Sequence, residues 1–429
     1  FWAIVLIEAL HLYPIIYLNA AAALANLDPA LEEAASGLGA SAWRRLRQIV
    51  IPLIRPGLFA GGTIVFIWSF TELGTPLMFD YQQVTPVQIF NGIKEMEGST
   101  QPYALTAVLL IVAAGTYLIG KVFLGGRAST MYAKASIRSV PRKLGVVGST
   151  AAIALFAGVT FAAMLPHISV VLASLSVEGA WYDSIVPTQW TTHNYDTALS
   201  HSLASDSIRN SLAYSSIAIG IDLFVGLAIG YLIVRVKVRG RGLVDALAML
   251  PLAVPGLVMA FGYVAMTLRW PFGKDDPLEG FISVVGANPN PMLLLVIAYA
   301  VRRLPYIVRS TVAGLEQTSG ELEEAALNLG ASRTRAIRTV VIPLITANLI
   351  AGGLLAFSFA MLEVSDSLIL AQRESDYPIT KAIYVLFERL GDGPGIASAM
   401  GVWAMALLAV TLVGASVLMG RKMGAIFRV

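Results

Sequence analysis

Two glutamates occupy matching places at the ends of two apolar runs. Glu72 follows the run that ends in Trp68–Phe70, and Glu363 stands 291 residues later in the same context. A charge inside a bilayer costs roughly 3 kcal/mol or more unless it faces a cavity or a partner, so these carboxylates are candidates for a function. Asp366, one helical turn beyond Glu363, adds a third acid, whereas the matching residue of the first run is Thr75. Such carboxylates could meet a hard cation or an amine along a polar path.

A structural role explains the same positions equally well. A glutamate at a helix end can bond to a neighbouring helix or reach the lipid headgroups. Glu8 and His11 are three residues apart on one helix, but two ligands do not complete a metal site. Asp222, between Gly220 and Gly226, is expected to satisfy a neighbouring helix. The pattern therefore predicts no metal site and no catalytic residue.

The composition excludes two further kinds of chemistry. The chain has no cysteine, which excludes disulfides, thiolate metal sites and iron–sulfur clusters. It also lacks the G-x-x-x-x-G-K-[ST] pattern, whose backbone amides and lysine cradle nucleotide phosphates. We therefore expect no cofactor in this chain and no ATP hydrolysis by the chain alone.

The elements that must position these residues are apolar helices. Hydrophobic residues make up 56% of the chain and charged residues 13%, which indicates an integral membrane protein. A span needs about 20 apolar residues, and nine stretches qualify. They lie at roughly 1–19, 57–79, 102–124, 149–175, 207–234, 243–268, 291–308, 346–370 and 395–419. Pro251 and Pro255 predict a kink in the sixth. We predict an all-α, polytopic protein in a lipid bilayer.

Basic connections alternate with connections that are poor in Lys and Arg. The positive-inside rule places the basic set in the cytoplasm. That set comprises the stretches from Arg44 to Arg55, Lys121 to Lys143, Arg235 to Arg241, Arg302 to Arg338 and Arg421 to Lys422.

One segment of 24 residues occurs twice, at 31–54 and 322–345, with 16 identical positions. Each copy reads Glu-Ala-Ala, three residues, then Gly, and ends with a proline at the start of a span. Gly39 and Gly330 stand where a left-handed helix cap is needed. The pattern predicts a short helix, a sharp glycine break and a second helix that enters the membrane. Residues suited to cap the first helix precede it, and these are Asp28 and Ser319.

The copies define two halves. Six predicted spans separate them, an even number, so both copies lie on one face of the membrane and the duplication is parallel. We expect a first half at 1–124 that is N-terminally incomplete with about three visible spans, and a second half at 149–429 with about six. A basic cytoplasmic linker at 125–148 would join these pseudo-symmetric halves.

The Glu-Ala-Ala spacing resembles the loop of ATP-binding-cassette importer permeases. Its duplication in one chain is similar to the fused permeases of the ferric-iron, thiamine and aminoalkylphosphonate group. The resemblance implies a type I ABC importer transmembrane fold, in which each loop is a coupling helix that docks on an ATPase. The implied docking residues are Glu33, Ala34, Ala35, Gly39, Glu324, Ala325, Ala326 and Gly330. The two glutamates could instead form salt bridges within the loop, and the sequence does not separate these roles.

The resemblance also implies partners and a location. Two cytoplasmic ABC ATPase subunits would bind ATP and Mg²⁺, and an extracytoplasmic solute-binding protein would deliver the substrate, with no nucleic acid involved. The expected location is a bacterial or archaeal inner membrane. Glu72, Glu363 and Asp366 become candidates for the translocation path of this importer, which is a permease and not an enzyme.

The substrate implied first is ferric iron, because the Glu-Leu-Gly at 72–74 and the fused layout look most like that group. Thiamine, aminoalkylphosphonate and polyamine import are the alternatives. A secondary transporter driven by ions is a further alternative, but such carriers often have inverted repeats, whereas this duplication is parallel.

Overall fold

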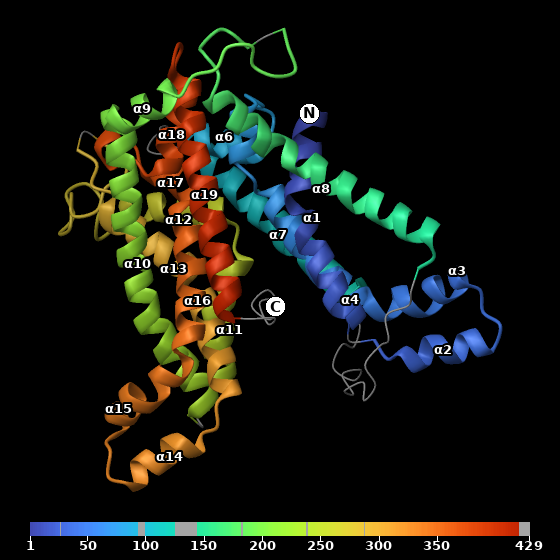
Figure 1. The fold of residues 1–429 in the computed structure, drawn as a ribbon. Helices are drawn as coiled ribbons and strands as arrows, with labels where there is room; N and C mark the ends of the chain where they lie inside the picture. Colours follow the sequence, from blue (N-terminus) through green and yellow to red (C-terminus); the bar gives the residue numbers. More distant parts are fainter. Residues whose placement is uncertain are drawn as a thin grey trace. The chain divides into compact units, whose positions relative to one another are not determined.

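The computed structural model describes residues 1–25, 27–92, 99–124, 144–181, 183–236, 239–286 and 288–419 (Figure 1). Across these ranges the regular structure is helical, apart from single β-bridges between Ser176 and Trp190 and between Ser283 and Asn290. Among the described residues, six helices are long and apolar enough to cross a membrane, or seven if one bent pair of helices counts as a single span. The predicted all-α, multi-span class is confirmed.

A helix forms at each of the nine predicted spans. Eight of them are α1 (Trp2–Ala25), α4 (Ile51–Phe70), α7 (Gln101–Leu124), α8 (Val146–Ser174), α10 (Ser202–Arg235), α13 (Met292–Gln317), α16 (Ile342–Met361) and α19 (Gly393–Met419). The remaining one is a pair, α11 (Arg241–Ala253) and α12 (Gly256–Thr267), bent by 96°. Pro255 stands at the start of α12, so the predicted proline kink is confirmed.

Two spans end earlier than predicted. The candidate spans were 57–79 and 346–370, and within them α4 ends at Phe70 and α16 at Met361. After a break of three residues, the short helices α5 (Gly74–Met78) and α17 (Ser365–Leu370) begin. The break forms because a glutamate side chain accepts the first amide hydrogens of each short helix. The sequence did not predict these breaks.

Packing divides the chain into two compact units. The first comprises Phe1–Val87 and Ala107–Pro166, and the second comprises Gln88–Thr106 and His167–Phe427. The division into halves by sequence repeat, at 1–124 and 149–429, stays a prediction. Most of the predicted linker, residues 125–143, lies outside the described residues.

The first unit is built around α1 and α4, which pack along each other. Glycine makes this approach close: a Cβ added at Gly57 would lie 2.7 Å from the Cβ of Ala23. Before α4, the chain forms α2 (Pro29–Gly37), α3 (Ala42–Arg45) and a π-helical turn at Leu46–Val50.

The second unit is a bundle in which α13 packs between α10 and α16, and α16 also packs on α19 (Figure 1). Here too glycines set the spacing, because a Cβ at Gly226 or Gly230 would lie 2.6 Å from a methyl of Ile307 or Thr311. One end of the bundle carries α14 (Glu321–Asn328), α15 (Arg333–Ala336) and a π-helical turn at Ile337–Val341. The other end carries α17 and α18 (Ile379–Phe387).

Candidate functional site

The two copies of the repeated segment fold alike. α3 and α15, the two π-helical turns, and α4 and α16 begin and end at residues that match at the offset of 291. Gly39 has φ 80° and Gly330 φ 88°, in the left-handed region that favours glycine, which confirms the predicted glycine break. Ser41 and Ser332 then cap the next helix, each accepting a backbone N–H at 3.3 Å.

Of the two residues predicted to cap these segments, Asp28 is the N-cap of α2, whereas Ser319 lies one residue before the N-cap of α14, which is Gly320. Asp28 Oδ1 accepts a hydrogen bond from the Ala30 amide at 2.9 Å, at the start of α2. Ser319 Oγ accepts one from the Glu321 amide at 3.2 Å, at the start of α14. Each copy is therefore a pre-formed pair of short helices, and its π-helical turn is a rare geometry that is frequent at functional sites.

The outer faces of α2 and α14 are exposed in the same pattern. Glu33 and Glu324 are exposed, as are Ala34 and Ala325, while Ala35 and Ala326 are half-buried. A leucine follows each helix, one residue before its glycine, and both Leu38 and Leu329 are 89% exposed. These leucines were not singled out from the sequence. The two copies therefore expose a leucine at the same place.

Different acids hold the loops in place. Glu32 pairs with Arg45 within its own loop at 3.6 Å. Its match, Glu323, is buried and accepts a hydrogen bond from Tyr231, and it pairs with Arg235 at 3.8 Å. Tyr231 and Arg235 belong to the end of α10, so this contact fixes α14 to the bundle. Glu33 and Glu324 form no ion pair with any residue that the structure describes. The salt bridges within the protein are therefore formed by Glu32 and Glu323, the residues that precede Glu33 and Glu324.

The first predicted pathway residue, Glu72, acts as a helix cap in the first unit. Its Oε1 accepts hydrogen bonds from the amides of Gly74 at 2.9 Å and Thr75 at 3.3 Å. A carboxylate at the start of a helix interacts favourably with the unsatisfied N–H groups there. Glu363 makes the corresponding contacts with the amides of Ser365 and Asp366.

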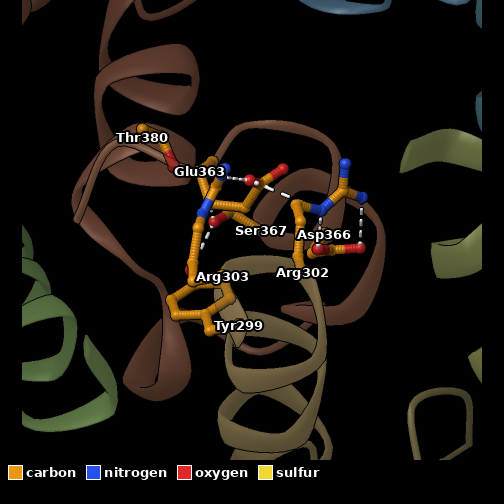
Figure 2. A network of polar contacts seen from close by, with 7 residues as sticks. All are labelled: Tyr299, Arg302, Arg303, Glu363, Asp366, Ser367 and Thr380. Atoms are coloured by element: carbon orange, nitrogen blue, oxygen red, sulfur yellow. Dashed lines mark hydrogen bonds and ion pairs between the residues drawn. The ribbon is translucent and has the colours of Figure 1, made fainter. Parts of the chain in front are cut away.

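Glu363 and Asp366 are buried in an ionic network with two arginines of α13 (Figure 2). Arg302 donates from Nε to Asp366 Oδ2 at 2.9 Å and from Nη2 to Oδ1 at 3.2 Å. Its Nε also lies 3.6 Å from Glu363, and Arg303 donates a hydrogen bond to Glu363. Every charge in this network has an opposite charge beside it, which is the condition under which buried charges are tolerated.

Neutral groups extend this network to neighbouring elements (Figure 2). The hydroxyls of Tyr299 and Ser367 lie 2.6 Å apart, and Ser367 donates to the Glu363 carbonyl. Thr380 of α18 donates to the same carbonyl at 2.6 Å. The network thus joins α13, α17 and α18.

The two arginines correct one prediction about topology. Arg302 was grouped with the basic cytoplasmic connection that runs to Arg338, but Arg302 and Arg303 lie within α13, and their side chains are only 15% and 12% exposed. They neutralise buried carboxylates instead of facing the cytoplasm. A pair of adjacent arginines inside an apolar stretch was the available signal, since such charges need an intramembrane partner.

The pathway role of Glu72, Glu363 and Asp366 stays a prediction, because the contacts found for them are structural ones. Asp222 is 1% exposed, and its Oδ2 has no hydrogen-bond partner among the described residues. Those residues also contain no cluster of three or more His, Cys, Asp or Glu side chains that could hold a metal ion. In α1, Glu8 is buried and His11 is exposed, so they do not face a common site.

Membrane-length helices and a duplicated, exposed loop define a multi-pass membrane protein. The family model described as "Binding-protein-dependent transport system inner membrane component" matches residues 1–127 and 223–421. The chain belongs to this family, and it is a multi-pass inner membrane protein.

Known relatives of the chain carry related names. The ferric transport system permease protein FbpB of Actinobacillus pleuropneumoniae is 28% identical over 428 residues, which is 96% of this chain and 58% of that protein. The Fe(3+)-transport system permease protein FbpB 2 of Haemophilus influenzae is 24% identical over 87% of this chain and 68% of its own length. The molybdenum transport system permease ModB of Escherichia coli is 29% identical over 47% of this chain and 87% of its own length.

The chain spans 58% of the length of the Actinobacillus relative. Among solved structures, a bacterial ABC transporter involved in alginate import matches with a TM-score of 0.48 and 16% identity, over 63% of this chain and 96% of that one.

Proposed function

We propose that this chain forms the transmembrane part of an ATP-driven importer that receives its substrate from an extracytoplasmic binding protein. The observation that carries the proposal is the duplicated loop, which repeats the same helix boundaries, glycine conformation and exposed face. Two equivalent surfaces on one chain suit a partner that is itself present in two copies. Two cytoplasmic ATPase subunits fit this requirement, and they would hold ATP and Mg²⁺, since the chain has no phosphate cradle.

Each ATPase subunit would grip one short helix by its exposed face. The alanines at 34, 35, 325 and 326 are small enough to let the helix approach a groove closely. Glu33 and Glu324 would pair with basic groups of the ATPase. Leu38 and Leu329 would enter an apolar pocket, and full burial of each would contribute about 1.5–3 kcal/mol to docking. Movement of the loops with the ATPase would then open and close the path.

The proposed substrate is ferric iron. Relatives named as ferric transport permeases match the chain over most of its length, which supports iron over thiamine, aminoalkylphosphonate and polyamines. The shorter match to a molybdenum transport permease covers about half of the chain and makes molybdate a useful comparison.

Docking is tested by replacing Glu33 and Glu324 together with glutamine in the full chain. We expect the membrane helices to stay folded, while recruitment of the ATPase and ATP-dependent uptake fall about tenfold or more, as for loss of an interface hot spot. Glu321→Gln is the matched control, because Glu321 is an exposed glutamate of α14, the helix of Glu324, and is not one of the proposed docking residues. Full recruitment and uptake in the double variant would contradict the docking role.

The substrate is tested in vesicles that contain the full-length chain, its copurified ATPase and its binding protein. Ferric iron, thiamine, aminoethylphosphonate and molybdate are supplied in parallel, with and without ATP. Uptake of iron that needs ATP supports the proposal, and uptake of another solute replaces the proposed substrate. Uptake that follows an ion gradient without ATP would favour the secondary transporter.

A further inference from the structure

The last residue of α10 contacts the ends of two other helices. This residue is Arg235, and its side chain is 19% exposed. Its Nη2 donates to the carbonyls of Leu315 at 3.1 Å and Thr318 at 2.8 Å, and lies 3.1 Å from the Thr318 hydroxyl. These groups stand at the end of α13, where the last carbonyls of a helix have no partner within the helix itself. Arg235 therefore caps α13 from the neighbouring helix.

The same arginine meets α14, the proposed docking helix of the second loop. Its Nε lies 3.8 Å from Glu323 Oε2, and Tyr231, one turn earlier in α10, donates to Glu323 Oε1. The guanidinium lies beside Gly320, where an added Cβ would be 3.3 Å from Arg235 Nη1. Because Glu323 is only 9% exposed, both of its oxygens face groups of α10. Two side chains of α10 thus hold the start of α14 against the end of α13.

An apolar cluster joins the same part of the bundle. Buried residues of α13, the π-helical turn and α16 form it, and partly buried residues of α10 pack against them. The buried members are Leu315, Val341 and Ile345, and the residues of α10 are Leu227, Tyr231 and Val234. Packed interiors have low compressibility and transmit displacement. A displacement of α14 is therefore passed to α10 as well as to its neighbours in the sequence.

The first copy of the loop is held in a different way. Glu32, which matches Glu323, pairs with Arg45 at 3.6 Å, and Arg45 also donates to the Ala40 carbonyl at 2.8 Å. These partners all belong to the loop itself. The residue that matches Arg45 in the second copy is Ala336. The second loop therefore lacks the internal arginine, and its glutamate pairs with an arginine of α10 instead.

We infer that Arg235 is the positioning residue through which movement of α14 is passed to α10. This role rests on the proposed function, because an ATPase must dock on α14 and move it. The docked helix is tied to a span that is not its neighbour in the sequence, so this span moves with it. In the first loop the arginine that pairs with the matching glutamate stabilises the loop alone.

The test compares Arg235→Gln with Arg45→Gln in the full chain, reconstituted in vesicles with its ATPase and its binding protein. Recruitment of the ATPase, ATP hydrolysis per complex, and the number of ATP molecules hydrolysed per solute taken up are measured for each variant. The solute is whichever of ferric iron, thiamine, aminoethylphosphonate and molybdate the parent chain takes up. Arg241→Gln is the control, because Arg241 is an exposed arginine at the start of α11.

We expect Arg235→Gln to keep ATPase recruitment and hydrolysis close to those of the parent, since the exposed face of α14 is unchanged. Uptake should fall, so that the ATP hydrolysed per solute rises about tenfold, within the range by which residues of a coupling network change coupling. Arg45→Gln should lower recruitment, hydrolysis and uptake together and leave the ratio unchanged, because it weakens only the folded loop. Arg241→Gln should change each quantity by less than about twofold, as for other surface substitutions.

A parental ratio in Arg235→Gln would overturn the role of Arg235 even if all rates fell, because that result is loss of folded complex and not of coupling. An equal rise of the ratio in Arg45→Gln would overturn the difference between the loops. Arg235→Lys provides a second variant in case the glutamine variant does not fold. Lysine keeps the charge but lacks the fork of donors, so the ratio should rise by a smaller factor, about threefold; a parental ratio would again overturn the role.

Failure of the proposed function is distinguishable, because it is seen in the parent chain before any variant is measured. A parent chain that recruits no ATPase would refute the proposed function and the role of Arg235 with it. A parent chain that couples hydrolysis to uptake, with the same ratio in both Arg235 variants, would refute the role of Arg235 alone.

Discussion

Asp366→Asn should destabilise the second packing unit by about 3–5 kcal/mol, the cost of breaking a buried ion pair by removing one partner. Asp366 is fully buried and bonds to Arg302 through both carboxylate oxygens, at 2.9 and 3.2 Å. The substitution leaves the guanidinium with an amide in place of a carboxylate. Relaxation is limited because the guanidinium also packs on Gly256, where an added Cβ would lie 2.1 Å from Arg302 Nη1.

The same reasoning predicts that removing both charges costs little. Replacement of a buried ion pair by apolar residues of similar volume is often neutral or stabilising, so Arg302→Met combined with Asp366→Leu should recover most of the lost stability. The single change should shift the unfolding equilibrium constant by roughly two to four orders of magnitude, since about 1.4 kcal/mol is a factor of ten. The double variant should return to within about one order of the parent chain.

Reversible unfolding in detergent, followed for the parent chain, both single variants and the double variant, measures this cycle. Thr75→Ala is the matched control, because Thr75 holds the place of Asp366 in the first half and lacks a charge; it should cost less than about 1 kcal/mol. An Asp366→Asn variant as stable as the parent would refute the reasoning. Equal loss in the single and double variants would show that the side chains matter for packing and not for charge.

Three further predictions test other parts of the structure. Gly330→Ala should weaken the α14–α15 loop by about 1 kcal/mol, because Gly330 has a φ of 88°. Gly37→Ala is the control and should not weaken its loop, because Gly37 lies in a helix and nothing is near the added Cβ. Hydrogen exchange of the loop amides measures both effects. Tyr231→Phe removes the bond to the buried carboxylate of α14 and should speed exchange in that helix by about tenfold, equivalent to about 1.5 kcal/mol; unchanged exchange would contradict the anchoring role. Glu72→Gln should leave the melting temperature nearly unchanged, because the amide oxygen of glutamine can still cap α5. Glu363→Gln should lower the melting temperature, because Arg303 loses its carboxylate partner. Equal melting temperatures of the two variants would contradict this difference.

Most of the fold could be predicted because its determinants are local. Apolar length predicts a helix at each span, and the glycines at 39 and 330 occupy the left-handed conformation that their spacing suggests. The two helix breaks could not be predicted in this way. An apolar run continues across each break, and only the side-chain bond from Glu72 or Glu363 to the next amides shows where the helix ends.

The candidate sites differ in the same way, because some depend on local sequence and others on contacts between distant residues. The exposed face of the duplicated loop follows from the repeat, since an amphipathic short helix places its residues by periodicity. Partners of buried charges depend on which helices become neighbours. Arg302 and Asp366 are 64 residues apart, and no local pattern connects them. The contact of Lys381 with Phe90 is equally remote in sequence.

The two halves share one element at the helix break and differ in another. The glutamate that caps the following short helix is present in both. The arginines and the aspartate are not, because the positions that match Arg302, Arg303 and Asp366 are His11, Leu12 and Thr75. The cap is therefore the common requirement, and the ionic network is an addition to the second half. The cap matters to both because it ends the span and starts the next short helix, α5 or α17. If the carboxylates served passage of a solute, the shared glutamates would be expected to stay accessible; instead one of them is 6% exposed and both hold backbone amides. The contacts found for the two glutamates are therefore structural, and their role in a translocation path stays a prediction.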